Sequence, residues 1–248
     1  MIEKLIQYIK ESNHIVFFGG AGVSTESGIP DFRSKDGLYN QHDIQFDKYP
    51  TEYLLSRDCL YHNPKVFYSF YRQKIDVRNI EPNITHKVLA KLEEIGKLKA
   101  IVTQNIDGLH QKAGNKTVYE IHGTSQENYC NKCYKAYPSD YIFETIEPIP
   151  KCKCGGLVRP NVTLYGENLP TKAVEDAIEA IENADMLIIA GTSLKVYPAA
   201  GFINNFAGKH LVVINKEKID ISLNVDTDLF FCESMGSVFG QLEQLFQE

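Results

Sequence analysis

The sequence lacks long apolar runs, and no stretch approaches the roughly 18 residues that a membrane-spanning helix requires. The N-terminus lacks the pattern of a secretory signal, because acidic and lysine residues run through its first turns and no small-residue cleavage site follows. Basic charge is not in excess either: 26 Lys and Arg face 32 Asp and Glu, for a formal charge of −6. We therefore expect a soluble, cytoplasmic protein that binds neither a membrane nor a nucleic-acid backbone directly.

Cysteine is scarce outside one short segment. Four of the six cysteines fall between residues 130 and 154, and only Cys59 and Cys232 lie elsewhere. Without an export signal, these residues are expected to be reduced thiols or metal ligands rather than disulfides. The other proportions, 43% hydrophobic and 23% charged, exclude wholesale disorder. A chain of 248 residues has room for one large α/β domain with a small insertion.

Short apolar runs alternate with helical patterns along most of the chain. Buried strands are expected at residues 15–18, 100–103, 118–121, 186–190 and 211–215. Helical spacing of apolar residues marks 2–9, 88–95, 174–181 and 238–246, and Gly96 is placed as a helix stop. This alternation predicts an α/β fold, with a mostly parallel Rossmann-like sheet covered by helices on both faces.

The rhythm weakens between residues 124 and 158, where cysteine, proline and glycine dominate. We interpret 124–158 as an inserted small zinc-binding domain, and 1–123 with 159–248 as the Rossmann-like domain. The helical segment at about 36–80 is expected to add to the small domain.

Each expected strand ends in glycine or polar residues. These ends are residues 19–22, 104–107, 122–123, 191–193 and Asn215. In open α/β sheets, ligands bind just beyond the carboxyl ends of the strands. The five ends are therefore expected to converge on one crevice.

The first of these ends is a glycine turn. Gly20-Ala21-Gly22 follows a strand, so its backbone amides and a following helix N-terminus can face a pyrophosphate. Thr25 stands where the usual dinucleotide fingerprint has a third glycine, and a tight turn that merely needs glycine is the alternative. Further on, Phe32 can pack over a flat ring and Arg33 can hold a phosphate or carboxylate.

Two further ends carry side chains suited to chemistry. Gln104, Asn105 and Asp107 follow a hydrophobic strand, and buried groups of this kind usually meet a ligand or one another. An Asx turn over the next residues would explain Asp107 alone. His122 is the best general-base candidate because its pKa lies near neutrality, although a purely structural histidine is the alternative. No serine elbow or activated-cysteine motif accompanies it, so an acyl-enzyme mechanism is not expected.

The clustered cysteines have metal-ligand spacing. Cys130-x-x-Cys133 is followed after 18 residues by Cys152-x-Cys154, a pair one residue tighter than the common spacing. Four thiolates fill the coordination sphere of tetrahedral zinc, so the predicted zinc is structural rather than catalytic. Redox chemistry at the first pair is the alternative.

Taken in order, these segments resemble the sirtuin family of NAD-dependent protein deacylases. The resemblance covers the chain from about residue 12 to the end. The matching strings are residues 20–25, 27–33, 103–110, 122–123, the four cysteines, 159–167, 191–193 and 214–215. It implies a large Rossmann-like domain and a small zinc-bearing one, with NAD and acyl-lysine meeting in the cleft between them.

The resemblance also implies roles for individual residues. His122 would be the general base, with Asn105 and Asp107 as further catalytic residues. Phe32, Ile106 and Asp107 would line the nicotinamide pocket, and Gln104 and Asn105 would reach the adjoining ribose. The remaining nucleotide contacts would be Gly20, Ala21, Gly22, Thr25, Arg33, Gly191, Thr192, Ser193 and Asn215. The acyl-lysine substrate would pair with Val162, Thr163, Tyr165, Gly166, Glu167, Leu194 and Val196.

The implied reaction is deacetylation of protein lysine, with NAD as co-substrate. The acyl oxygen attacks the ribose carbon that carries nicotinamide, nicotinamide leaves as product and inhibitor, and the acyl group ends on ADP-ribose. Mono-ADP-ribosyl transfer is the alternative within the family. An NAD-dependent dehydrogenase is disfavoured, because Thr25 replaces the third glycine and no acidic residue follows the next strand at the expected distance. A nucleic-acid-binding zinc ribbon is disfavoured by the charge of −6.

The chain departs from the family pattern at a few positions. Gly20 replaces a usual threonine, Thr163 replaces a usual valine, and 236–237 lack the acidic residue that relatives often place near adenine. Sirtuins that prefer acidic acyl groups carry Tyr-x-x-Arg, whereas this chain has Tyr68-x-x-Tyr71, with Arg72 turned about 100° around the helix. Deacetylation is therefore expected over desuccinylation.

Overall fold

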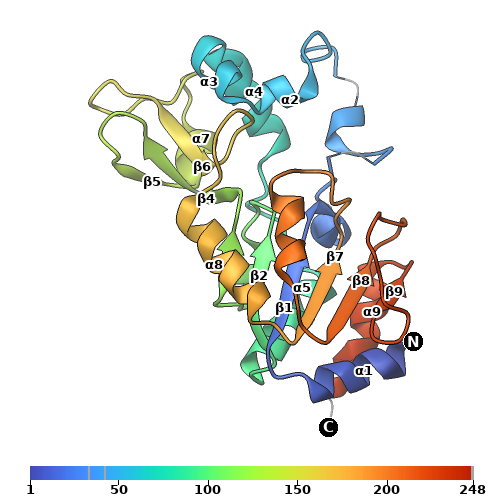
Figure 1. The fold of residues 1–248 in the computed structure, drawn as a ribbon. Helices are drawn as coiled ribbons and strands as arrows, with labels where there is room; N and C mark the ends of the chain where they lie inside the picture. The colour runs from blue at the N-terminus through green and yellow to red at the C-terminus, as the bar shows by residue number, and fades with distance from the viewer. Residues whose placement is uncertain (33, 42, 247–248) are drawn as a thin grey trace.

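The computed structural model describes residues 1–32, 34–41 and 43–246. Its main feature is a six-stranded parallel sheet with the strand order β3-β2-β1-β7-β8-β9 (Figure 1). The strands are β1 (Ile15–Gly19), β2 (Leu98–Thr103), β3 (Val118–Glu120), β7 (Met186–Ala190), β8 (His210–Ile214) and β9 (Leu229–Phe231). The predicted α/β class with a Rossmann-like sheet is confirmed.

Helices cover both faces of this sheet, because its strands alternate in side-chain direction. Phe17 packs on the face covered by α1 (Ile2–Glu11), α5 (Ile84–Glu94) and α9 (Met235–Leu242). Phe18, its neighbour on β1, packs on the opposite face against α8 (Thr171–Glu182) and the 3₁₀ helix η3 (Ala199–Asn205). Gly96 follows α5 with φ of 76°, as its prediction as a helix stop requires. Within the described ranges, no helix is long and apolar enough to cross a membrane.

A smaller antiparallel sheet has the order β5-β4-β6. Its strands are β4 (Gly123–Cys130), β5 (Ala136–Pro138) and β6 (Val158–Val162), and α7 (Asp140–Glu144) lies beside them. These strands were not predicted, because buried and exposed residues do not alternate regularly along β4. β6 also runs past the expected boundary at residue 159, since Val162 pairs with Gly123.

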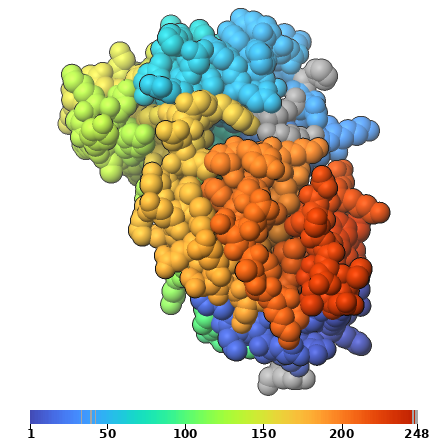
Figure 2. Space-filling model, viewed as in Figure 1, coloured from blue at the N-terminus to red at the C-terminus, as the bar shows by residue number. Residues whose placement is uncertain are grey.

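Three short helices pack on this smaller sheet: α2 (Thr51–Leu54), α3 (Arg57–His62) and α4 (Pro64–Lys74). Phe67 and Tyr71 of α4 share a hydrophobic cluster with Ile142 of α7 and Val162 of β6. Figure 2 shows the 50–75 segment and the 124–158 segment together at one end of the molecule, beyond the body formed by the parallel sheet.

The remaining differences from expectation are local. The edge strand β9 was missed because its three residues are too few to show a period. The glycine turn leads into a 3₁₀ helix, η1 (Ala21–Ser27), rather than an α-helix, and Gly28 ends it in the left-handed conformation. The closing helix is α9 followed by η4 (Glu243–Phe246). The short helices η2 (Leu38–Asn40) and α6 (Leu109–Ala113) complete the described elements.

The carboxyl ends of the parallel strands lie at one level. Gly19 pairs with Thr103 on one side and Ala190 on the other, while Ala190 pairs with Ile214. The turn after β1 also packs directly on the turn after β7. A Cβ atom on Gly20 would lie 2.8 Å from the Gly191 carbonyl oxygen, and one on Gly22 would lie 2.7 Å from the Gly191 Cα. Glycine at 20 and 22 therefore allows the two backbones to touch.

Candidate active site

A cavity of about 1950 Å³ opens beyond the carboxyl ends of the parallel strands. It is bounded by the glycine turn, the segment after β2, His122, the loop after β6 and the turns after β7 and β8. The predicted residues on its wall are Gly20, Ala21, Gly22, Thr25, Phe32, Gln104, Asn105, Ile106, Asp107, His122, Val162, Thr163, Tyr165, Gly166, Glu167, Gly191, Thr192, Ser193, Leu194, Val196 and Asn215. Arg33 lies outside the described residues. The expected convergence of strand ends on one crevice is thus present.

The glycine turn fits a dinucleotide. Gly20 and Gly22 line the cavity, and no side chain stands between their backbone and a ligand. The Thr25 hydroxyl donates to the Gly22 carbonyl at 2.9 Å, and this hydrogen bond within the segment stabilises the turn. The Gly20 and Gly22 amides donate to the Ala190 and Gly191 carbonyls at 3.2 and 2.8 Å, so what the turn offers a pyrophosphate is close approach to a backbone without side chains.

A buried hydrogen-bond chain forms one polar wall of the cavity. Asn105 Nδ2 donates to Ser24 Oγ at 3.1 Å, and Ser24 Oγ donates to Asp107 Oδ2 at 2.7 Å. Asp107 Oδ1 also accepts the Leu109 amide at 2.9 Å, so the Asx turn considered as an alternative coexists with the contact to the site. Burial raises the pKa of Asp107 above its usual value, although the Leu109 and Ser24 hydrogen bonds counteract it.

Ser24 is a site residue that the sequence analysis did not single out. It is buried, lines the cavity and joins two predicted residues that have no direct bond to each other in the described structure. Its only signal was its place in the glycine-turn string, where a serine is also common for local reasons.

His122 is held in the tautomer that a general base needs. Its Nδ1 lies 2.9 Å from the Gln104 carbonyl oxygen, which can only accept, so Nδ1 carries the proton and Nε2 keeps a free lone pair. Burial lowers the pKa of His122, and the bond to Gln104 partly offsets this. The imidazole is therefore neutral at cellular pH. Gln104 is fixed in turn, because its Nε2 donates to Thr192 Oγ1 at 3.1 Å.

The 162–167 loop is tied to the base and to the helical segment through its backbone. The Thr163 amide donates to the His122 carbonyl at 2.8 Å. The Tyr165 amide donates to the Leu55 carbonyl at 3.0 Å, and its carbonyl accepts the Arg57 amide at 3.0 Å. In the part of the chain that the structure describes, the Gly166 backbone has no such partner. An extended peptide can therefore pair with the loop at this point.

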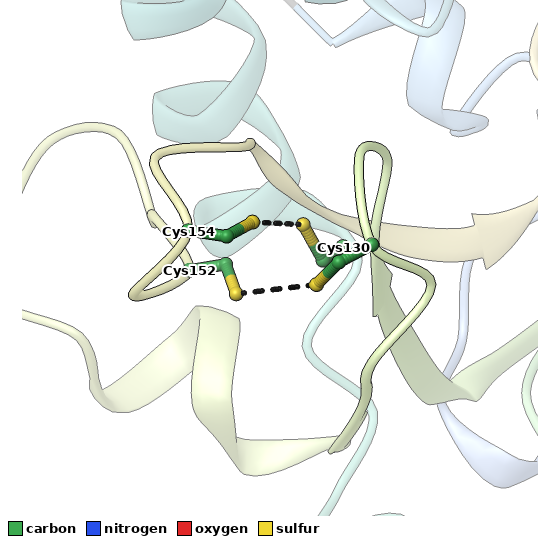
Figure 3. Close-up of side chains that lie close together, drawn as sticks. Cys130, Cys152 and Cys154 are labelled. Atoms are coloured by element: carbon green, nitrogen blue, oxygen red, sulfur yellow. Dashed lines mark hydrogen bonds between the residues drawn. The ribbon is translucent and has the colours of Figure 1, made fainter.

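The four predicted metal ligands converge at the far side of the smaller sheet. The four sulfur atoms lie within 4.8 Å of one another, with 3.5 Å between Cys130 and Cys154 and 3.6 Å between Cys133 and Cys152 (Figure 3). Zinc–sulfur bonds of about 2.3 Å in a tetrahedron place sulfur atoms about 3.8 Å apart, so the group fits zinc and the tight second pair is no obstacle. None of the four lines the cavity, as expected for a structural metal.

Helix α4 turns Arg72 away from the cavity, whereas Lys74 at its C-terminal end lines the cavity and lies 3.6 Å from Asp43. Arg72 donates from Nε to the Ile142 carbonyl at 2.7 Å and from Nη2 to the Glu147 carbonyl at 2.9 Å. Tyr68 donates its hydroxyl to the Val158 carbonyl at 2.8 Å. Tyr71, which is fully buried, forms part of the cavity wall. At the position where the resemblance places arginine in sirtuins that prefer acidic acyl groups, the helix thus presents the uncharged ring of Tyr71 to the cavity.

The parallel sheet, the glycine turn at its carboxyl edge and the remote four-thiol group define a dinucleotide-binding α/β protein with a structural zinc module. Residues 20–198 match the Sir2 family. The chain belongs to the Sir2 family, and the predicted sirtuin membership is confirmed.

Similar proteins cover the whole chain. The NAD-dependent protein deacetylase of Clostridium perfringens (strain 13 / Type A) is 53% identical over 97% of this chain and 98% of its own. That of Clostridium acetobutylicum is 50% identical over 96% of each chain. A solved Sir2 with p53 peptide and NAD⁺ superposes with a TM-score of 0.85 at 36% identity and covers 100% of this chain and 99% of its own. Another, with deacetylated p53 peptide and 3′-O-acetyl ADP-ribose, has a TM-score of 0.84 at 35% identity over 99% and 97%.

Proposed function

We propose that this protein is an NAD-dependent protein-lysine deacetylase that cleaves NAD to nicotinamide and transfers the acetyl group to ADP-ribose. The two clostridial deacetylases, at 53% and 50% identity over nearly the whole chain, support this activity. The observation that carries the proposal is the shared cavity. The glycine turn, His122 and the 162–167 loop face the same space, so a dinucleotide and a peptide can meet at the base.

In this proposal His122 is the general base. Its Nε2 accepts a proton from a ribose hydroxyl, and the Gln104 carbonyl stabilises the imidazolium through Nδ1. The pKa of His122, lowered by burial, keeps the ring unprotonated and ready at neutral pH. Activation of the ribose hydroxyl lets its oxygen receive the acyl group from the reacting amide.

Asn105 and Asp107 act through the chain that Ser24 completes. With its carboxylate fixed by Ser24 and the Leu109 amide, Asp107 presents a rigid polar edge to the nicotinamide carboxamide. Phe32 and Ile106 supply the apolar wall on which the ring rests. Nicotinamide binds here as product and inhibitor.

The acetyl-lysine peptide lies between the 162–167 loop and residues 194–196 and pairs with both as an added strand. The apolar residues around the cavity exclude bulk water from the reacting carbon. When bound, zinc fixes the loops of the smaller sheet and supplies no chemistry to the reaction. Because the substrates are NAD and modified proteins, we place the enzyme in the cytoplasm.

The direct test mixes the full-length protein with NAD and an acetyl-lysine peptide, with the unmodified peptide as control. Release of nicotinamide in equal amount to deacetylated peptide and O-acetyl-ADP-ribose, followed by mass spectrometry, is the expected result. Growth of NADH absorbance would instead indicate a dehydrogenase. A peptide that gains the mass of ADP-ribose without losing acetyl would indicate mono-ADP-ribosyl transfer.

A further inference from the structure

A buried ion pair lies directly behind the 162–167 loop. Arg159, on β6, is 5% exposed, and its guanidinium meets the Glu167 carboxylate with both terminal nitrogens, Nη1 to Oε1 at 2.5 Å and Nη2 to Oε2 at 2.8 Å. This two-point geometry is available to arginine but not to lysine. The Tyr129 ring lies under the guanidinium, with its centroid 5.6 Å from Cζ.

The same two side chains bind the backbone of the loop from within. Arg159 Nη2 donates to the Val162 carbonyl at 2.9 Å, and Glu167 Oε2 accepts the Leu164 amide at 3.0 Å. Glu167 also closes the loop by donating its own amide to the Leu164 carbonyl at 2.9 Å. The pair therefore occupies two backbone groups in the first half of the loop, the Val162 carbonyl and the Leu164 amide, the latter from a carboxylate that stands at the other end.

Charge keeps the pair intact at neutral pH. Burial alone would raise the pKa of Glu167, but hydrogen bonds from Arg159 and the Leu164 amide hold it below its usual value. Both carboxylate oxygens are engaged inside the protein. Although Glu167 reaches the cavity wall, its charge is directed to Arg159.

We propose that Arg159 and Glu167 are positioning residues that hold the 162–167 loop in the shape that pairs with the acyl-lysine peptide. This proposal rests on the proposed deacetylase function. By occupying the inward backbone groups, the pair leaves Gly166 facing the cleft as a pairing site. In this proposal Glu167 shapes the peptide site without contacting the peptide, whereas the resemblance implied that it pairs with the substrate. Because the Thr163 amide donates to the His122 carbonyl, the position of the loop relative to His122 is fixed.

The central test is Glu167→Gln in the full-length zinc-loaded protein. The KM for an acetyl-lysine peptide is expected to rise about tenfold or more, whereas the KM for NAD and the kcat at saturating peptide change less than about threefold. Arg159→Lys keeps the charge but loses the two-point contact, so it is expected to raise the peptide KM as well. Asp176→Asn is the matched control, because it breaks the exposed Lys172–Asp176 ion pair on α8 and is expected to leave all three constants unchanged.

A peptide series separates positioning from direct contact. If Glu167 shapes the loop, the rise in KM is the same for acetyl-lysine peptides with neutral and with lysine-rich flanks. A loss confined to the lysine-rich peptides would show that Glu167 reads substrate charge, and would overturn the proposal.

Removing one member of a buried ion pair can unfold a protein, so a second variant that is expected to fold is also needed. Arg159→Met combined with Glu167→Leu replaces the pair by apolar side chains, which is commonly tolerated. This variant is expected to fold and still show the raised peptide KM, because the Val162 carbonyl and the Leu164 amide have lost their partners. A folded variant with the wild-type peptide KM would overturn the proposal, whereas a wild-type protein that releases no nicotinamide would refute the proposed function itself.

Discussion

The carboxyl edge of the parallel sheet and the four-cysteine module are stabilised by different means. Among the described residues, the two faces of the sheet have clusters of 22 and 13 buried hydrophobic residues, whereas the cluster around the four cysteines has only Cys130, Cys152 and Val158. Apolar burial is the main stabilising force in folding, so we expect the module, but not the sheet, to depend on a bound metal for its stability.

This difference explains where the chemistry lies. Polar groups at the sheet edge, such as the buried Asp107 and Ser24, are costly to bury, and a large core offsets that cost. The cysteine module has a much smaller core, and its four sulfur atoms lie within 4.8 Å of one another in an arrangement that could hold a zinc ion. The candidate catalytic residues therefore belong to the sheet edge, and of residues 124–158 only Ser125 lines the cavity.

Removal of zinc is expected to have the largest effect, because it should destabilise the cysteine module and leave the parallel sheet folded. Structural zinc binds small modules with about 10–16 kcal/mol, so a strong chelator is expected to unfold residues 124–158 while the parallel sheet keeps its protection. Elemental analysis should give one zinc per chain, and hydrogen exchange followed by segment should separate the two regions. Cys232→Ser, at an exposed cysteine outside the cluster, should keep the zinc. A metal-free protein that stays ordered throughout and active would refute this.

The His122→Ala variant tests catalysis at the carboxyl edge of the sheet without changing the cysteine module. General-base catalysis contributes about 10²- to 10⁴-fold, so the turnover rate is expected to fall by that factor while NAD binding and the melting temperature are retained. Deacetylation of a peptide at saturating NAD, with calorimetry for NAD binding, measures both effects. His62→Ala changes an exposed histidine on α3 and should behave as wild type. Retained turnover in His122→Ala would remove the residue as the base.

Glu120 should make the sheet edge sensitive to pH. Burial raises its pKa from 4.5 to about 7, hydrogen bonds with Thr124 and Gln111 counteract this rise, and the charges of Asp107 and Glu127 add to it. The folded state then holds a proton that the unfolded state has lost, so stability falls as pH rises from 4.5 to about 7, by about 3 kcal/mol. Glu120→Gln is expected to remove this loss and to be the more stable protein at pH 8.

The measurement is the difference in unfolding free energy between the variant and the wild type at several pH values. Taking that difference cancels the titration of the buried histidines. Glu3→Gln, at an exposed glutamate on α1, should show no pH-dependent difference from wild type. A constant difference between Glu120→Gln and wild type across the window would contradict the shifted pKa.

The preference for acetyl-lysine over succinyl-lysine is the smallest expected effect. It depends on Arg72, which lies where the helical segment meets the cysteine module. Arg72 is held by carbonyl groups beside the cysteine module, so a succinyl carboxylate would enter the cavity without an arginine partner. Acetyl-lysine is therefore expected to turn over about tenfold faster or more than succinyl-lysine. Tyr71→Arg should raise the ratio of succinyl to acetyl turnover, and Tyr68→Phe should not. Equal turnover of the acetyl- and succinyl-lysine peptides by the wild-type protein would contradict the expected acetyl preference.

Periodicity predicted the parallel sheet because its central strands are continuous apolar runs. Residues 186–190 and 211–215 were placed within one residue of β7 and β8. The same reasoning failed for β4, β5 and β6, whose pairing joins residues distant in the sequence and whose exposed side chains are mixed. Such strands are specified by their partners, which the sequence alone does not display.

The site was predictable where polar residues directly follow an apolar strand, as Gln104 and Asn105 follow β2. The zinc group was predictable because metal ligation imposes a spacing on cysteines. Ser24 and Arg159 were not found, because their importance comes from hydrogen bonds across 83 and 8 positions of the chain. The family and the deacetylase activity were predicted correctly from long matching strings, whereas the individual residue roles stay predictions.

The contact between the turns at Gly20, Gly22 and Gly191 has a consequence for protein engineering. Two turns that touch backbone to backbone cannot be redesigned separately, since an added methyl group on one would displace the other. An attempt to change the nucleotide preference by grafting the first turn from another enzyme would shift the second turn, which carries Thr192 and, through it, Gln104. Both turns would have to be exchanged together, as a single cassette.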